Sequence, residues 1–199
     1  MSVRFVDPET KRVVYPEPFQ APLNAVTPGL GINAPPVGAI IVNPLLAPVV
    51  LSWDVGRSFE TLVEQWPQAE LARLAQSATQ PPQELIEIQS PHLPWKIEVR
   101  PRTPNVHVTV FDMLTTIYAA LKLHITPDEW DQFNTVGKQD IVAARGLRVQ
   151  EYDPVRQVDE MYDYPRRIDS LGELTRFAGL VPAPRRGPRS LDLKLKRRR

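Results

Sequence analysis

Two capping boxes constrain the fold of this chain more than any other feature of its sequence. Thr109 is followed three residues later by Asp112, and Thr126 is followed at the same distance by Glu129. In such a box the Thr hydroxyl accepts a hydrogen bond from a free amide of the first helical turn, and the carboxylate accepts one from the cap backbone. Pro127 strengthens the second box, because the first helical position needs no N–H. We therefore predict one helix beginning after Thr109 and another beginning after Thr126.

Apolar residues follow both caps at the spacing of a helix that buries one stripe. In the first helix the stripe consists of Val110, Leu114, Ile117, Tyr118 and Leu121. In the second, the residues expected to point inward are Trp130, Phe133, Ile141 and Ala144. Both helices are therefore expected to pack on a core.

The segment from Trp95 to Arg100 alternates strictly between apolar and charged residues. This is the period of a strand with one face in a core and one in water. Residues 85–89 precede it across a loop that holds Pro91 and Pro94. The two segments are predicted to pair as a hairpin.

Further strands are expected at residues 49–55, 168–171, 174–180 and 191–195. Gly172 suits the first central position of a type II′ turn, which predicts a hairpin between the strands on either side of it. Because strands come from both ends of the chain with helices between them, segregated layers are favoured over a parallel βαβ sheet. The residues expected in the core are Trp53, Trp95, Ile97, Val99, Leu114, Ile117, Leu121 and Phe177.

The predicted fold class is α+β, with a mainly antiparallel sheet of about five or six strands and two capped helices on one face. A Pro-rich arm precedes it, since nine of the 22 prolines lie in the first 50 residues. The 36 residues from Pro18 to Trp53 carry no charge but many aliphatic side chains, so the arm is expected to pack on the domain. A polyproline-like ligand segment is the alternative. The predicted organisation is an arm over residues 1–48, one domain over 49–195 and a basic tail over 196–199.

Several segments together resemble the signature of a known family. They are Leu51-Ser52-Trp53-Asp54, Pro91-His92-Leu93-Pro94-Trp95-Lys96-Ile97-Glu98-Val99, Val108-Thr109-Val110-Phe111-Asp112-Met113-Leu114, Ile125-Thr126-Pro127-Asp128-Glu129 and the end segment Arg166 to Leu180. Over roughly Pro44 to Leu195 the chain resembles an uncharacterised domain family that is abundant in mushroom-forming fungi. The motifs are structural in kind, and the resemblance implies no activity, cofactor or site residue.

Positive charge is concentrated at the C-terminal end. Residues 182–199 carry a net charge of +7 within a chain of net charge +1, so the remaining residues sum to −6. The basic residues are Arg185, Arg186, Arg189, Lys194, Lys196, Arg197, Arg198 and Arg199. They are candidate contacts for an acidic partner, a polyanion or the acidic stretch 151–163 of another copy; a nuclear-import signal and a solubilising terminus are the alternatives. No aromatic residue is interleaved with them, so no platform for stacking bases is expected.

Residue types suited to catalysis are few. The chain has no cysteine, which excludes disulfides, thiolate metal sites and cysteine nucleophiles. The histidines, His92, His107 and His124, are too far apart in sequence to form a local ligand pair. Nucleophile elbows, phosphate loops and metalloprotease helices are absent from the sequence. We therefore predict no catalytic residue, no cofactor and no metal.

These observations favour a non-catalytic, intracellular protein-interaction module. An enzyme acting on a small substrate in a cleft that no motif reveals is one alternative. A sequence-nonspecific nucleic-acid-associated protein acting through its basic C-terminus is another. No signal-peptide core or membrane-length apolar run is visible, so a cytoplasmic or nuclear, non-secreted protein without membrane contact is expected. Protein partners, self-association and weak polyanion binding are the interactions to test.

Overall fold

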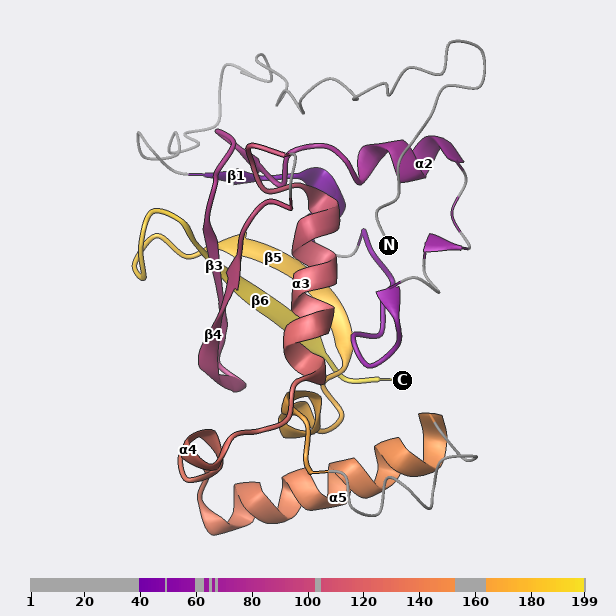
Figure 1. The fold of residues 1–199 in the computed structure, drawn as a ribbon, viewed down its shortest axis with the longest axis vertical. Coiled ribbons are helices and arrows are strands. Elements are labelled where there is room, and N and C mark those ends of the chain that lie inside the picture. The colour runs from indigo at the N-terminus through magenta and orange to yellow at the C-terminus, as the bar shows by residue number, and fades with distance from the viewer. Residues whose placement is uncertain are drawn as a thin grey trace, which may run out of the picture.

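The computed structural model describes residues 40–48, 50–59, 63–64, 66, 68–102, 105–152 and 164–198. Most of the expected arm over residues 1–48 lies outside this range, as do most of the acidic stretch 151–163 and the terminal Arg199. The described chain is mixed α and β (Figure 1).

Four strands form one sheet in the order β4-β3-β6-β5, and two short strands, β1 and β2, form a separate pair. The strands are β1 (Ile41–Val42), β2 (Thr79–Gln80), β3 (Ile86–Ser90), β4 (Leu93–Val99), β5 (Arg176–Pro182) and β6 (Ser190–Lys196). The α-helices are α2 (Gln68–Arg73), α3 (Val110–Lys122), α4 (Pro127–Trp130) and α5 (Thr135–Tyr152), and the 3-10 helices are η1 (Pro44–Leu46) and η3 (Arg167–Leu171).

The predicted hairpin at residues 85–100 is confirmed. β3 and β4 pair antiparallel, with Ile88 opposite Ile97. Side chains alternate along β4, so that Ile97 is buried while Lys96 and Glu98 are exposed. The register with β3 shifts beyond Ile97. The charge alternation in the sequence therefore marks the solvent face of a strand.

A second hairpin completes the sheet from the other end of the chain. β5 and β6 pair antiparallel, and β6 then lies parallel to β3, with Leu191 next to Ile88. Leu191 and Leu193 are fully buried. β6 is an inner strand, which explains why its apolar side is so completely covered.

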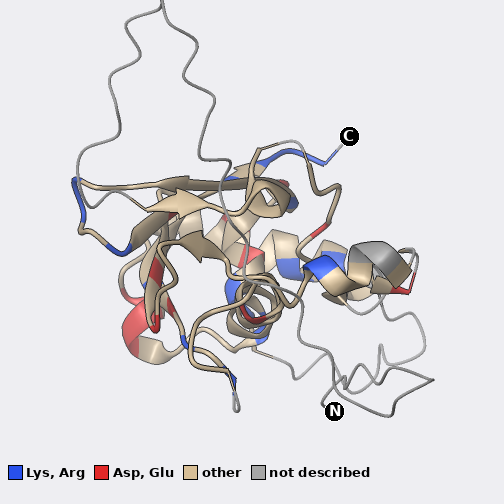
Figure 2. Ribbon diagram, turned by 90° about the horizontal axis from the view of Figure 1, so that it is seen from above, with Lys and Arg blue, Asp and Glu red and all other residues tan. Residues whose placement is uncertain are grey.

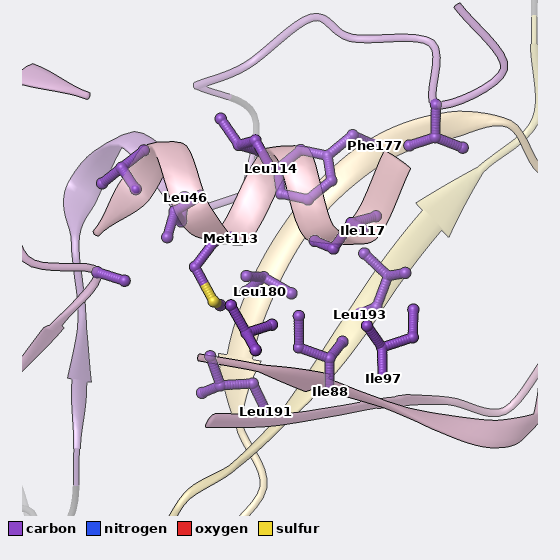
Figure 3. Packing of buried hydrophobic residues seen from close by; sticks show 14 of the residues in the cluster. Leu46, Ile88, Ile97, Met113, Leu114, Ile117, Phe177, Leu180, Leu191 and Leu193 are labelled. Atoms are coloured by element: carbon purple, nitrogen blue, oxygen red, sulfur yellow. The ribbon is translucent and has the colours of Figure 1, made fainter. Parts of the chain in front are cut away.

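α3 covers one face of this sheet, and the main core lies between them (Figures 1 and 3). The predicted cap is confirmed: Oγ1 of Thr109 accepts a hydrogen bond from the N–H of Asp112 (3.1 Å), and the Asp112 carboxylate accepts one from the N–H of Thr109 (3.0 Å). Figure 3 shows Met113 and Ile117 of α3 directed at side chains of the sheet.

The predicted core residues are buried, with the exception of Trp95. Trp95 lies only partly buried at the margin of the core, where its ring meets that of Phe133 edge to face with 6.3 Å between centroids. The guanidinium of Arg167 lies over the same ring at 4.9 Å. The ring is thus covered by a second aromatic residue and a cation instead of aliphatic side chains.

The expected strand at residues 168–171 is wrong, and so is the hairpin about Gly172, because this segment forms η3. The N–H of Arg166 donates to the Asp169 carboxylate (2.7 Å), which coils the chain locally. Ile168 and Leu171 are both buried, at the three-residue spacing of a 3-10 helix instead of the two-residue spacing of a strand.

The expected strand at residues 49–55 is irregular. Its alternate apolar residues are buried as expected, but among the residues that the structure describes it bridges β5 only at Asp54, opposite Arg176. The ladder stops because β5 bulges between Phe177 and Gly179. This segment therefore lies along the edge of β5 without becoming a strand.

The second capping box is confirmed, but the helix behind it is short. Thr126 caps α4, with Pro127 at the first helical position. The side chain of Asn134 then accepts a hydrogen bond from the N–H of Gly137 (2.8 Å), and α5 begins at Thr135. α5 packs against η3 beyond the end of the sheet (Figure 1), so the expected pair of helices on one face is wrong and α3 alone takes that place.

Residues 40–48 lie against the domain beside β5. The amide of Asn43, which is 1% exposed, donates to the carbonyl of Ser77 (2.9 Å). At Gly179 the φ angle is +113°, and a Cβ built there would lie 2.6 Å from the nitrogen of Pro48. Glycine therefore allows a backbone conformation and a close approach that other residues would prevent.

Candidate functional site

A groove with a cavity volume of about 1110 Å³ lies between α5 and η3. α5 forms one wall, and η3 with the residues that follow it forms the other. Arg197 and Arg198 close one end of the groove.

The two walls are joined by a buried ion pair. Nε of Arg148 on α5 lies 2.7 Å from one carboxylate oxygen of Asp169 on η3, and a second guanidinium nitrogen lies 3.2 Å from the other oxygen. The side chain of Asp169 is 1% exposed, and that of Arg148 is 11% exposed. Bidentate geometry and the bond from the N–H of Arg166 satisfy the buried carboxylate. The pair therefore fixes the distance between the walls.

η3 makes a second ion pair, in which it supplies the cation instead of the carboxylate: Arg167 pairs with Glu129 of α4. Burial acts to raise the pKa of Glu129, but the hydrogen bonds from Arg167 and Thr126 and the charge of Arg167 outweigh it, so this pKa is lowered. Two residues of η3, Arg167 and Asp169, thus hold α4 and α5 in place.

The C-terminal end of the groove is also paired. The guanidinium of Arg198 lies 3.5 Å from the carboxylate of Asp54. The backbone N–H of Arg198 donates to the backbone carbonyl of Glu173 (3.0 Å). The side chains of Arg197 and Glu173 lie 3.7 Å apart and are largely exposed. Residues 196–198 are therefore tied to the domain.

Apart from Asp140, the rest of the lining is apolar or uncharged. Leu147 of α5 is 66% exposed although it lines the groove, and Ala143 and Ala144 lie beside it. The hydroxyl oxygen of Thr175 is shielded from solvent and has no hydrogen-bond partner among the described residues. The groove therefore combines apolar area with one hydroxyl that has hydrogen-bonding capacity to spare.

The basic residues expected to form one tail are separated (Figure 2). Arg185, Arg186 and Arg189 lie in the loop between β5 and β6, and Lys194 and Lys196 lie on β6 itself. Arg197 and Arg198 lie at the groove, at the far end of the same strand. Arg199 falls outside the described residues.

The loop arginines differ in their contacts. Arg186 donates to Oε1 of Gln89 (2.6 Å) and lies 3.6 Å from Asp192, which also pairs with Lys194 at 3.3 Å. Arg185 and Arg189 are exposed, and their side chains make no recorded ion pair within the described residues. Among the described residues, these two are therefore the cations of the loop without a recorded ion pair.

A family model described as "Family of unknown function (DUF6699)" matches residues 51–189. The chain belongs to this family. The expected resemblance to an uncharacterised family is confirmed in this form, over a narrower range than Pro44 to Leu195. No curated protein and no solved structure matches the chain. The DUF6699 match includes α5 and η3 but ends before Arg197 and Arg198.

The histidines lie on separate elements. His92 is in the turn between β3 and β4, His107 precedes α3, and His124 follows α3, where Nδ1 lies 3.2 Å from the carbonyl oxygen of Tyr164. Among the described residues, His, Asp and Glu side chains form no group that could hold a metal ion. None of the helices in this part of the chain is long and apolar enough to cross a membrane.

Sequence reasoning missed the groove. Arg148 and Asp169 are 21 residues apart, and nothing in the local spacing of either residue points to the other. The signal that could have located this part of the groove is Asn134-Thr135-Val136-Gly137, since an Asn before a helical segment is a strong cap and would have separated α5 from α4.

Proposed function

We propose that this DUF6699 chain is a non-catalytic protein-interaction module, and that the groove between α5 and η3 receives a segment of its partner. The pairing of the groove's charges carries the proposal. The pairs are Arg148 with Asp169, Arg197 with Glu173, and Arg198 with Asp54. Groups that neutralise one another are poorly suited to proton transfer, whereas the apolar side chains between them offer contact area.

The lining indicates the chemistry of the segment. Leu147 and the alanines beside it suit one or two aliphatic or aromatic anchor residues. Arg197, which is 80% exposed, suits an acidic residue flanking the anchors. A cytoplasmic or nuclear location belongs to the proposal and rests on the cysteine-free composition.

An enzyme acting on a small substrate in the same groove is the rival. Among the described lining residues, Asp140 is the carboxylate that takes no part in these ion pairs, and it is exposed. A single exposed carboxylate does not favour general acid–base catalysis, which needs a tuned group beside its substrate. The interaction module is therefore the stronger proposal.

Selection of a displayed random peptide library on the full chain tests the groove. We expect the selected peptides to carry an apolar anchor beside an acidic residue. The change Leu147→Glu should weaken their binding by at least about tenfold, because it places an unpaired charge against the anchor.

The matched control is Val106→Glu, which adds the same charge at an apolar position that is 74% exposed and outside the groove. This variant should bind the peptides as the wild type does. Peptides that bind both variants as tightly as the wild type would refute the groove as the binding site.

Polyanion binding is a second candidate, favoured by the exposed Arg185 and Arg189 in the loop between β5 and β6. Pro184 and Pro188 flank these arginines, which stiffens the loop and reduces the entropy lost on contact. Two cations without acidic neighbours can each contact a backbone phosphate. Such binding would be independent of base sequence.

Changing Arg185 and Arg189 to Ala tests this candidate. The slope of log affinity for duplex DNA against log salt concentration should fall by about 2, equally for duplexes of unrelated sequence. Changing Arg197 and Arg198 to Ala removes the same charge from the other end of β6 and should leave the slope unchanged. If only the change of Arg197 and Arg198 lowered the salt slope, the phosphate contacts would lie at the groove end of β6.

A further inference from the structure

β4 is an open edge of the four-stranded sheet. It ends the strand order β4-β3-β6-β5, and in the described part of the chain no backbone group is recorded as bonding to its outer side. The other edge, β5, is covered instead: the N–H of Phe177 donates to the carbonyl of Trp53 (2.8 Å), and the N–H of Val55 donates to that of Thr175 (2.8 Å). Among the described residues, one edge is therefore protected by the chain itself, and the other is unpaired.

The backbone groups at this edge can be assigned. The N–H of Glu87 donates to the carbonyl of Arg189, so the polar groups of Glu87 face β6. Neighbouring residues of a strand direct these groups to alternate sides, so those of Ile88 face β4 and bond to its partner Ile97. It follows that Glu98 directs its N–H and C=O groups outward. The C=O of Lys96 also points outward, because it shares a peptide plane with the N–H of Ile97; the register shift toward Leu93 begins at Lys96.

Charge selects one way of covering this edge with an identical strand. In an antiparallel pair related by a twofold axis, the outward-facing residues must oppose each other. An axis at Lys96 would place two lysines face to face, and an axis at Glu98 would place two glutamates face to face. An axis at Ile97 places Lys96 opposite Glu98 of the second copy, twice, and backbone hydrogen bonds can join each such pair. An axis at Val99 would place Glu98 opposite Arg100, but Arg100 lies beyond the end of β4.

Within one copy both charges have only surface partners. Glu98 lies directly opposite Glu87 of β3 and 3.5 Å from the guanidinium of Arg100, while the Nζ of Lys96 lies 3.2 Å from the Glu87 carboxylate. Like charges in opposed positions destabilise a sheet. The side chains of Lys96 and Glu98 are each 58% exposed, so both can meet a second copy.

We propose that the chain forms a twofold-symmetric dimer in which β4 pairs antiparallel with β4 of a second copy, centred on Ile97. The two four-stranded sheets then join into one continuous sheet, and the Lys96 of each copy compensates Glu98 of the other. Pro94, which lacks an N–H and would limit pairing of an edge strand, lies outside the paired centre, where its carbonyl can still accept a bond. This interface is separate from the groove of the proposed function.

Charge exchange at two exposed positions tests the dimer. Molar mass of the full chain, measured by light scattering during gel filtration and by sedimentation, should rise with concentration from monomer to dimer. The single changes Lys96→Glu and Glu98→Lys should each weaken the dimer by about tenfold or more, because both symmetric pairs become like-charged. The double variant should restore wild-type association.

The decisive sample is an equimolar mixture of the two single variants. In the proposed register each carries the charges that the other needs, so the mixture should form a mixed dimer more readily than either variant alone. Thermal melting of the separate variants verifies that each is folded, as expected for changes at solvent-facing positions.

A wild-type protein that stays monomeric up to its solubility limit would overturn the proposal. This holds even if a variant without residues 1–39 formed a dimer, because the β4 edge of the full chain would then be covered by the chain itself. A dimer that persists unchanged in both single variants would also overturn it. So would a dimer abolished by Leu147→Glu, because the interface would then be the groove. Loss of peptide binding without loss of the dimer would contradict only the proposed function.

Discussion

Gly179→Ala is expected to destabilise the protein by at least about 3 kcal/mol, or to prevent folding. The backbone at this position has φ +113°, which non-glycine residues adopt only with strain, and the added methyl group would lie 2.6 Å from the nitrogen and 2.7 Å from the Cα of Pro48. Backbone atoms cannot rotate away as a flexible side chain can. Urea denaturation followed by tryptophan fluorescence measures the change in the free energy of unfolding.

Two other glycines separate the cost of backbone strain from the cost of the steric clash. Gly172 has φ +54° with no atom within 4 Å of a built Cβ, so Gly172→Ala should cost only the backbone strain, about 1–2 kcal/mol. Gly146 lies within α5 with open space around it, so Gly146→Ala should stabilise by about 0.5–1 kcal/mol. If Gly179→Ala cost no more than Gly172→Ala, residues 47–48 would not pack against β5 as described.

Arg148→Met is expected to destabilise the protein by about 3–5 kcal/mol, because it leaves the charge of Asp169 buried without its cation. The carboxylate is 1% exposed and would keep only the bond from the N–H of Arg166 in this arrangement. The amides of α5 should also exchange their hydrogens faster, because the ion pair that holds α5 against η3 is lost. Hydrogen exchange of the α5 amides, measured beside chemical denaturation, reports both effects.

The double variant Arg148→Met with Asp169→Asn provides the control. The amide oxygen can still accept the bond from Arg166, and no charge remains buried, so most of the lost stability should return. Arg197→Met removes a guanidinium from an exposed pair with Glu173 and should change stability by less than about 0.5 kcal/mol. A loss in the double variant as large as that in Arg148→Met would mean that the buried charge is not the cause.

The parts of the fold that the sequence predicted depend on local signals. Thr109 and Thr126 cap helices because each has its hydrogen-bonding partner three residues away, and the alternation around Ile97 identifies both a strand and its buried face. These features need no knowledge of the distant chain.

The failures arose where local and distant signals compete. Residues 49–55 alternate as a strand does, and their apolar side chains are buried, yet the bulge at Gly179 removes the neighbour that would complete the ladder. At residues 168–171 the short side chain of Asp169 bonds to backbone three residues earlier, which favours a coil over an extended strand. The basic C-terminal residues were treated as one set of candidate contacts, although the strand predicted at residues 191–195 already lies between the first and the last of them, and β6 places them at its opposite ends.

The parallel contact between β3 and β6 has a consequence for how the molecule is assembled during synthesis. β3 and β4 emerge from the ribosome about a hundred residues before β6, and a hairpin of two strands has little stability by itself. Both of its edges are unpaired during that interval, so the edge of β3 that later pairs with β6 stays open to other chains. Closing so long a loop makes formation of the central pairing slow. Nascent chains of this protein are therefore expected to depend on chaperones until Lys196 has emerged.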